Sequence, residues 1–150
     1  MKASKAKYYM GIAEAVSLAS HDTQTKVGGI LVKGDGAVVA TSFNGFVRGA
    51  PDSILPTTRP DKYVFIQHCE LNLLTHCARH GISTDNTTCV ITLTPCVKCI
   101  RLLHQAGIND IIAKTAYSDF EESLMLPDVN VIAYISEDTG FINLTIRNMV

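Results

Sequence analysis

The chain has 150 residues, a formal net charge of −1 and a sequence pI near 6.5. Its length predicts one domain, 1–150, and its 47% hydrophobic and 18% charged residues exclude a disordered protein. The near-neutral charge argues against a nucleic-acid polymer as partner, and no apolar run approaches the ~18 residues of a membrane span. We therefore expect a cytoplasmic protein with a small-molecule partner.

The first half of the chain predicts one helix, one hairpin and one long loop. Apolar residues recur at helical spacing over 5–20. Two strand-like runs, 27–32 and 37–41, flank Asp35-Gly36, which is typical of a hairpin turn. The segment 44–67 holds three of the five prolines and fits neither period, so we expect a long loop of the kind that often carries function.

The second half alternates strands and helices. The predicted elements are a helix over 68–81 stopped by Gly81, a strand over 87–93, a helix with Thr94 as N-cap and Pro95 as first helical residue that ends at Gly107, strands over 108–113 and 129–135, and a short helix over 119–126. The last dozen residues fit neither period. This order predicts an α/β protein, a three-layer α/β/α fold with a five-stranded mixed sheet whose later strands are parallel.

Two predicted helix starts carry metal-binding residues. His68-Cys69-Glu70 opens one, and Cys96 and Cys99 lie in the first turn of another. A catalytic zinc site uses three His or Cys ligands and keeps its fourth position for water, and a helix N-terminus favours the thiolate form of cysteine. We therefore expect Zn²⁺ on His68, Cys96 and Cys99, with Glu70 moving protons to and from the bound water.

Other uses of these residues remain open. A structural zinc needs a fourth protein ligand, for which Cys69 is the nearest donor, although it points about 100° around the helix from His68. His76 and His80 lie about 12 and 18 Å along a straight helix and cannot share that ion. A thioredoxin-like pair would leave His68 and Glu70 without a role. A non-catalytic nucleotide-binding module with a structural zinc is the alternative outside the enzymes.

The motifs together resemble the deoxycytidylate (dCMP) deaminases of the zinc-dependent cytidine/deoxycytidylate deaminase family. The pattern H-x-E followed by P-C-x-x-C marks zinc deaminases. The similar segments, between about residues 8 and 114, are 22–29, 42–49, 68–72, 94–99 and 105–108. The resemblance implies a cytidine-deaminase-like fold, hydrolysis of dCMP to dUMP and ammonia, His68, Cys96 and Cys99 as zinc ligands, Glu70 as proton shuttle, a homohexamer, activation by dCTP and inhibition by dTTP.

The resemblance also implies binding residues. Asn44 is expected to contact the nucleotide, in a loop that reads Ser42-Phe43-Asn44-Gly45 where the family has Gly-Tyr-Asn-Gly. The further candidates are Thr25, Lys26 and Tyr117 for substrate, and Phe43, Gly45, Arg48 and Arg79 for effectors. Arg59 and Lys62 join Lys26 and Arg48 as cations that could hold a single phosphate. Other possible substrates are dCTP, deoxycytidine and, less in keeping with the charge, tRNA adenosine.

Overall fold

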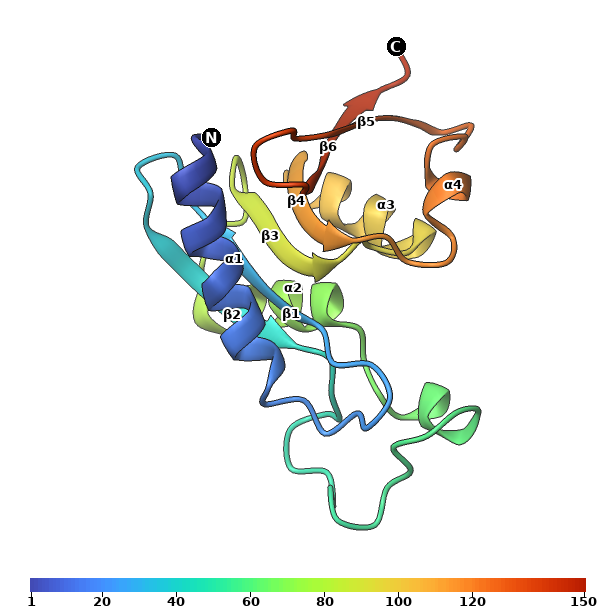
Figure 1. The fold of residues 1–150 in the computed structure, drawn as a ribbon. Helices are drawn as coiled ribbons and strands as arrows, with labels where there is room; N and C mark the ends of the chain where they lie inside the picture. The colour runs from blue at the N-terminus through green and yellow to red at the C-terminus, as the bar shows by residue number, and fades with distance from the viewer.

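The computed structural model describes all 150 residues, as one six-stranded sheet between two helical layers. The elements are α1 (Ala3–Ser17), β1 (Gly28–Val32), β2 (Val38–Phe43), the 3-10 helix η1 (Asp61–Val64), α2 (Cys69–His80), β3 (Thr88–Leu93), α3 (Val97–Gln105), β4 (Asp110–Thr115), α4 (Phe120–Ser123), β5 (Val129–Ile135) and β6 (Ile142–Asn148). The strand order is β2-β1-β3-β4-β6-β5 (Figure 1). The predicted three-layer α/β fold is thus confirmed.

The predicted number of strands is wrong, because residues 142–148 form a sixth strand. β6 lies between β4 and β5 and pairs antiparallel with both. Its side chains alternate, with Ile142, Leu144 and Ile146 buried and the residues between them more exposed. This alternation has the period of two that a half-buried strand requires. It begins at Ile142, directly after Phe141, an apolar residue that does not fit the alternating pattern and so hides it in the sequence. The three later strands that were predicted, β3, β4 and β5, run in the same direction as expected, but only β3 and β4 pair directly, because the antiparallel β6 separates β5 from β4.

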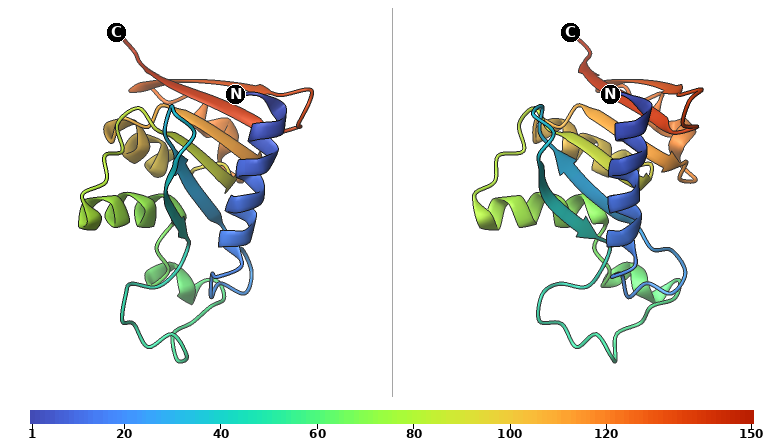
Figure 2. Two further views of the ribbon diagram at one scale, coloured as in Figure 1. Left: turned by 90° about the vertical axis from the view of Figure 1, so that its left-hand side faces the viewer. Right: turned by 60° about the vertical axis from the view of Figure 1, so that its left-hand side comes forward.

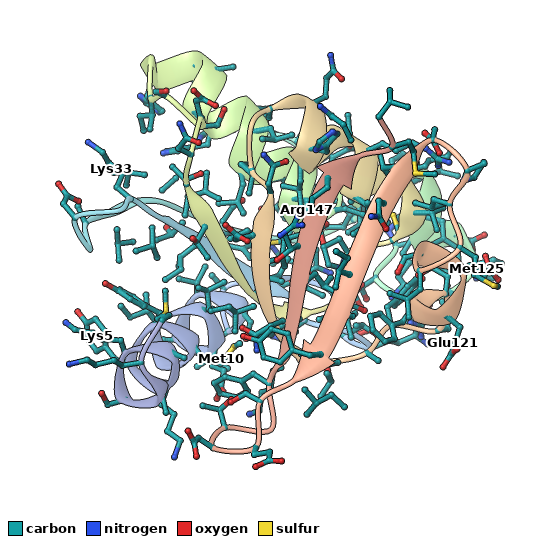
Figure 3. The ribbon with its side chains drawn as sticks, turned by 90° about the horizontal axis from the view of Figure 1, so that it is seen from above. Lys5, Met10, Lys33, Glu121, Met125 and Arg147 are labelled. Atoms are coloured by element: carbon teal, nitrogen blue, oxygen red, sulfur yellow. The ribbon has the colours of Figure 1, made fainter.

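The two faces of the sheet are covered by different helices. Figure 2 shows α1 on one side of the sheet and α2 and α3 on the other. The buried side chains of α1 include Tyr9, Met10 and Ala13, and Figure 3 shows Met10 pointing from α1 toward the sheet while Lys5 points outward. At Gly28 the helix comes so close that a Cβ atom would lie 2.1 Å from the backbone oxygen of Ala13. Glycine at this position therefore permits the close packing of α1 on β1.

The helices α2 and α3 bury Leu73, Ile100 and Leu103 against the opposite face of the sheet. α2 ends at His80, and its C-cap residue Gly81 has a φ of 67°, the left-handed conformation expected of the stop residue. The predicted start of α3 is wrong by two residues: the helix begins at Val97, and the N-cap residue is Cys96. Thr94 does not cap it, because its hydroxyl accepts the backbone N–H of Tyr117 at 2.7 Å.

The segment 44–67 runs beyond one end of the sheet, beside residues 18–27 (Figure 1). It is irregular except for η1, and a single antiparallel bridge joins Gly45 to Gln67 across its base. The amino ends of α2 and α3 and the carboxyl ends of β3 and β4 face the same region, the place where α/β sheets commonly bind ligands. None of the helices has both the length and the apolar character needed to cross a membrane.

Candidate active site

The first residues of α2 and α3 bring three potential metal ligands together. His68 is the N-cap residue of α2, Cys96 that of α3, and Cys99 lies in the first turn of α3. The Nδ1 atom of His68 lies 3.6 Å from the sulfur of Cys96 and 3.6 Å from that of Cys99. Tetrahedral zinc, with bonds of about 2.3 Å to sulfur and about 2.0–2.1 Å to nitrogen, separates these ligand types by about 3.5–3.6 Å. The three side chains therefore fit a zinc ion.

The electrostatics of the two thiols also suit a metal. Hydrogen bonding from the Cys99 thiol, helped by His68, lowers the pKa of Cys96 to about 4. The interaction with Cys96 and burial raise the pKa of Cys99. One thiol is thus ionised at neutral pH and keeps its neighbour protonated in the absence of a cation. A divalent cation stabilises both thiolates, so that Cys96 and Cys99 can be ionised at the same time.

Glu70 lies beside this trio, with its side chain closed off from bulk solvent. It is 4% exposed and lines the pocket that His68 and Cys96 also line. Burial raises the pKa of its carboxyl, and the positive charge of His68 opposes that shift. A carboxyl group whose pKa is moved toward neutrality is suited to accept a proton and return it.

None of the alternative fourth ligands reaches the trio. Cys69 is 1% exposed in the core, and its thiol donates to the backbone oxygen of Ser42 at 3.3 Å. His76 and His80 pair with each other, with ring centroids 4.5 Å apart, farther along α2. The three groups that could hold one ion are His68, Cys96 and Cys99 alone. This geometry favours a catalytic zinc site over a structural one.

Replacing Cys69 by alanine tests that distinction. The Cys69→Ala variant is expected to keep one zinc per chain and to lose only about 1 kcal/mol of folding free energy, because it removes one buried sulfur. Cys96→Ala is the matched comparison and is expected to lose the metal. Zinc content by atomic absorption and urea unfolding supply the two measurements. Loss of zinc in Cys69→Ala would instead make Cys69 a ligand.

A pocket opens beside His68 and Cys96. Its lining residues are Asp22, Thr25, Val27, Asn44, Arg59, Lys62, Tyr63, Ile66, His68, Cys69, Glu70, Leu93, Thr94, Cys96 and Tyr117. Arg59 donates to the Tyr63 hydroxyl at 2.6 Å and to Thr25 Oγ1 at 2.9 Å. None of the salt bridges of the chain involves Arg59, so its positive charge is not neutralised by a carboxylate.

Lys62, the other cation of the pocket, has a different role from the one predicted. Its Nζ lies 2.7 Å from Asp22 Oδ2, and the two side chains are 4% and 3% exposed. The Asp22 carboxylate also accepts the backbone N–H groups of Gln24 and Thr25. Burial tends to raise the pKa of Asp22, but these hydrogen bonds outweigh it and the pKa is lowered. Lys62 therefore ties η1 to the segment around Asp22, and its charge is already neutralised.

Asn44 stands at the centre of the same network. Its Oδ1 accepts the N–H of Val27 at 2.8 Å, and its Nδ2 donates to Thr25 O at 2.8 Å and to Asp22 Oδ2 at 3.4 Å. The residue lines the pocket, but both of its amide donors already have partners. Its role in contacting a nucleotide remains a prediction.

The other predicted site residues fall into three groups. Thr25 and Tyr117 line the pocket with Asn44, whereas Lys26 is exposed and is not among its lining residues. The effector candidates Phe43, Gly45, Arg48 and Arg79 line a second cavity. His76 also lines this cavity, with Nδ1 3.4 Å from Arg48.

Sequence reasoning missed two residues close to the site. Tyr63, whose hydroxyl accepts a hydrogen bond from Arg59, lies four residues after that arginine, a spacing that could have suggested the contact. Asp119 was expected only as the start of a short helix, yet its carboxylate accepts the backbone N–H of Val97 beside the metal ligands. No local signal indicates a contact across 22 residues.

Comparisons with known proteins agree with this geometry. Residues 3–115 match the family model of the cytidine and deoxycytidylate deaminase zinc-binding region. The crystal structure of dCMP deaminase from cyanophage S-TIM5 in complex with dCMP and dUMP is 30% identical, with a TM-score of 0.69 over 83% of this chain and 93% of that one. Deoxycytidylate deaminase of Homo sapiens is 28% identical over 78% of this chain and 68% of its own length. An uncharacterized deaminase of Aliivibrio fischeri is 32% identical over 77% of this chain and 76% of its own.

Proposed function

Because the chain belongs to the cytidine and deoxycytidylate deaminase family and is a zinc-binding enzyme, we propose that its reaction is the hydrolysis of dCMP to dUMP and ammonia. The observation that carries the proposal is a single pocket in which His68, Cys96 and the buried Glu70 lie with Arg59, a cation without a carboxylate partner. This combination offers a hydrolytic centre for the base and a positive charge for a phosphate. The dCMP deaminase of cyanophage S-TIM5, crystallised with dCMP and dUMP, supports the same substrate.

His68, Cys96 and Cys99 hold the zinc in this proposal. When bound in a site of this type, zinc lowers the pKa of a coordinated water to about 7. Glu70 accepts a proton from the attacking water as its oxygen bonds to C4, and delivers that proton to N3 of the ring. Glu70 then takes the remaining proton of the hydroxyl group on C4 and passes it to the amino nitrogen, and the C4–N bond breaks as the C4 carbonyl forms and ammonia leaves. The buried position of Glu70 keeps its carboxyl away from bulk water.

Arg59 holds the 5′-phosphate in this proposal. Its guanidinium is oriented by Tyr63 and Thr25, both neutral, so its charge is free for an anion. In Arg59→Gln, kcat/KM for dCMP is expected to fall about 10- to 100-fold, since a hydrogen bond to a charged group contributes about 1.5–3 kcal/mol. The rate on deoxycytidine, which has no phosphate, is expected to stay at the wild-type level. Steady-state kinetics on both substrates measure this selectivity.

Two further variants make the assignment decisive. Arg101→Gln removes an exposed arginine paired with Asp128, away from the pocket, and is expected to leave both rates unchanged. Lys26→Gln tests the cation proposed from the sequence, and a selective loss of dCMP activity there would move the phosphate to Lys26. An equal fall on dCMP and deoxycytidine in Arg59→Gln would contradict a phosphate contact.

The substrate itself is tested by comparing rates on dCMP, dCTP, deoxycytidine and a tRNA hairpin. The proposal predicts the highest kcat/KM on dCMP. A preference for deoxycytidine or dCTP would assign the alternative deaminase activities, and activity on none of the four in zinc-loaded protein would favour the non-catalytic module.

Control by dCTP and dTTP is the second part of the proposal. The second cavity is lined by Arg48, Arg79 and His76 and by no acidic residue, so it suits a polyanion, while Phe43 and Phe46 offer aromatic surfaces to a base. Titration of dCMP turnover with each triphosphate is expected to show activation by dCTP and inhibition by dTTP. Arg79→Gln is expected to weaken both effects and to leave the basal rate unchanged. An absence of any response to either triphosphate would contradict this part.

We further propose a homohexamer in the cytoplasm. Exposed apolar side chains in the long loop, among them Val47, Ile54 and Val64, offer surface for contacts between copies of the chain. The five free cysteines suit a reducing compartment. Light scattering coupled to size-exclusion chromatography is expected to give six times the 16.3 kDa mass of the chain. A monomer at working concentration would contradict the assembly.

A further inference from the structure

The first turn of α3 is capped by a side chain from a distant segment. Cys96, the N-cap residue, makes no side-chain hydrogen bond to the helix. The Oδ2 atom of Asp119 accepts the backbone N–H of Val97 at 3.2 Å instead. Asp119 lies at the start of α4 but does not cap its own helix. Since the first N–H groups of a helix have no partner within it, Asp119 serves the turn that presents both cysteines.

The donors of this turn are divided among different acceptors. The N–H of Ile100 donates to the backbone oxygen of Cys96 at 2.9 Å. Together with the bond from Val97 to Asp119, this bond holds Cys96 in a fixed orientation at the start of α3.

Asp119 makes the last of several contacts that join the segment after β4 to the segment before α3. Thr94 donates its backbone N–H to Thr115 O at 2.9 Å, and its hydroxyl accepts the N–H of Tyr117 at 2.7 Å. These bonds align residues 115–119 with residues 94–97. The carboxylate of Asp119 is therefore brought to the metal-binding turn by a defined stretch of backbone.

The second carboxylate oxygen of Asp119 has no hydrogen bond, so the position of this side chain costs folding free energy. Oδ1 is the one buried side-chain nitrogen or oxygen atom of the chain that has no hydrogen-bond partner. A buried polar atom without a partner destabilises a fold by about 1–3 kcal/mol. Stability of the fold alone does not account for a carboxylate at this position.

We propose that Asp119 is a positioning residue for the zinc site: by holding the N–H of Val97, it fixes the turn on which Cys96 and Cys99 present their sulfurs to the metal. Outer contacts of this kind orient metal ligands and influence metal affinity. The inference rests on the metal site of the proposed function. The role of Asp119 is tested without substrate. A protein that binds zinc but fails to deaminate dCMP would therefore refute dCMP as the substrate and leave the test of Asp119 intact.

The experiment compares Asp119→Ala and Asp119→Asn in zinc-loaded protein. Asp119→Ala removes the acceptor, and zinc transfer to a chromogenic chelator is expected to become about 10–100-fold faster, the usual effect of losing such a contact. Asp119→Asn keeps an oxygen for the N–H of Val97 and is expected to release zinc at close to the wild-type rate. In Co²⁺-substituted protein, the visible absorption bands, which report ligand geometry, should change in Asp119→Ala and stay as in wild type in Asp119→Asn.

Asp128→Ala is the matched control. Asp128 also contacts α3, through a salt bridge to Arg101 at 2.6 Å, but this contact lies at the surface. Asp128→Ala should leave zinc release and the cobalt spectrum unchanged. Wild-type behaviour of Asp119→Ala in both measurements, or equally fast release from Asp119→Asn, would overturn the proposal. If Asp119→Ala does not fold, Asp119→Glu carries the test, since it displaces the acceptor by one methylene, and an unchanged cobalt spectrum there would overturn the proposal as well.

Discussion

Substitution of Glu70 by glutamine is expected to lower kcat on dCMP by about 10²–10⁴-fold, because glutamine keeps the shape of the side chain but cannot accept or return a proton. Glu70 is buried, lines the pocket and does not belong to the group of three metal ligands. Glu70→Gln should therefore still bind one zinc per chain and bind dCMP with little change in affinity. Stopped-flow or steady-state kinetics, together with zinc content and dCMP titration, measure the three quantities.

Glu121→Gln serves as the control for this variant. Glu121 is exposed on α4, pointing away from the sheet in Figure 3, and its substitution should leave kcat unchanged. Retained turnover in Glu70→Gln would refute the role of Glu70 as proton shuttle. Loss of zinc together with activity would show that Glu70 holds the metal site instead of moving protons.

The second large effect is expected on stability, at the buried pair of Lys62 and Asp22. Replacing Lys62 by methionine leaves the Asp22 carboxylate buried without its cation, a change that costs about 3–5 kcal/mol of folding free energy. Both side chains are almost completely closed off from solvent, and the pair joins the long loop to the segment before β1. Urea unfolding at neutral pH, where Asp22 is ionised because its pKa is lowered, measures the change.

A double variant separates the lost charge pair from lost packing. Asp22→Asn combined with Lys62→Met leaves no buried charge, so it should be more stable than Lys62→Met alone. Lys114→Met is the control: Lys114 pairs with Glu14 at 2.8 Å, but both side chains are about half exposed, and this loss should cost at most about 1 kcal/mol. A cost below about 1 kcal/mol for Lys62→Met would contradict the buried pair.

The zinc ligands could be predicted from the sequence because each half of the site is local. Cys96 and Cys99 are three residues apart in one helical turn, and His68 stands two residues before Glu70. Helix starts, residue type and spacing are sufficient to define such halves. The order of elements then places both helix starts at the same end of the sheet, and the structure brings the three ligands within 4.8 Å of one another.

Features that depend on contacts between distant residues could not be predicted in the same way. Lys62 was one of four cations that could hold a phosphate, since nothing in its neighbourhood along the chain indicates that Asp22, 40 residues earlier, neutralises it. The cap on α3 was assigned to Thr94 because a local threonine fits the helix-start pattern, whereas the hydroxyl is used by Tyr117 and the cap comes from Asp119. The strand β6 was missed because its alternation is short and follows directly on Phe141.

Zinc K-edge X-ray absorption on the isolated protein tests most directly whether His68, Cys96 and Cys99 form a centre with one position left for water. The expected result is one zinc per chain with two sulfur neighbours at about 2.3 Å and two nitrogen or oxygen neighbours at about 2.0–2.1 Å, of which one is an imidazole. Three sulfur neighbours, or two imidazoles, would place a fourth protein ligand on the metal and contradict a hydrolytic site.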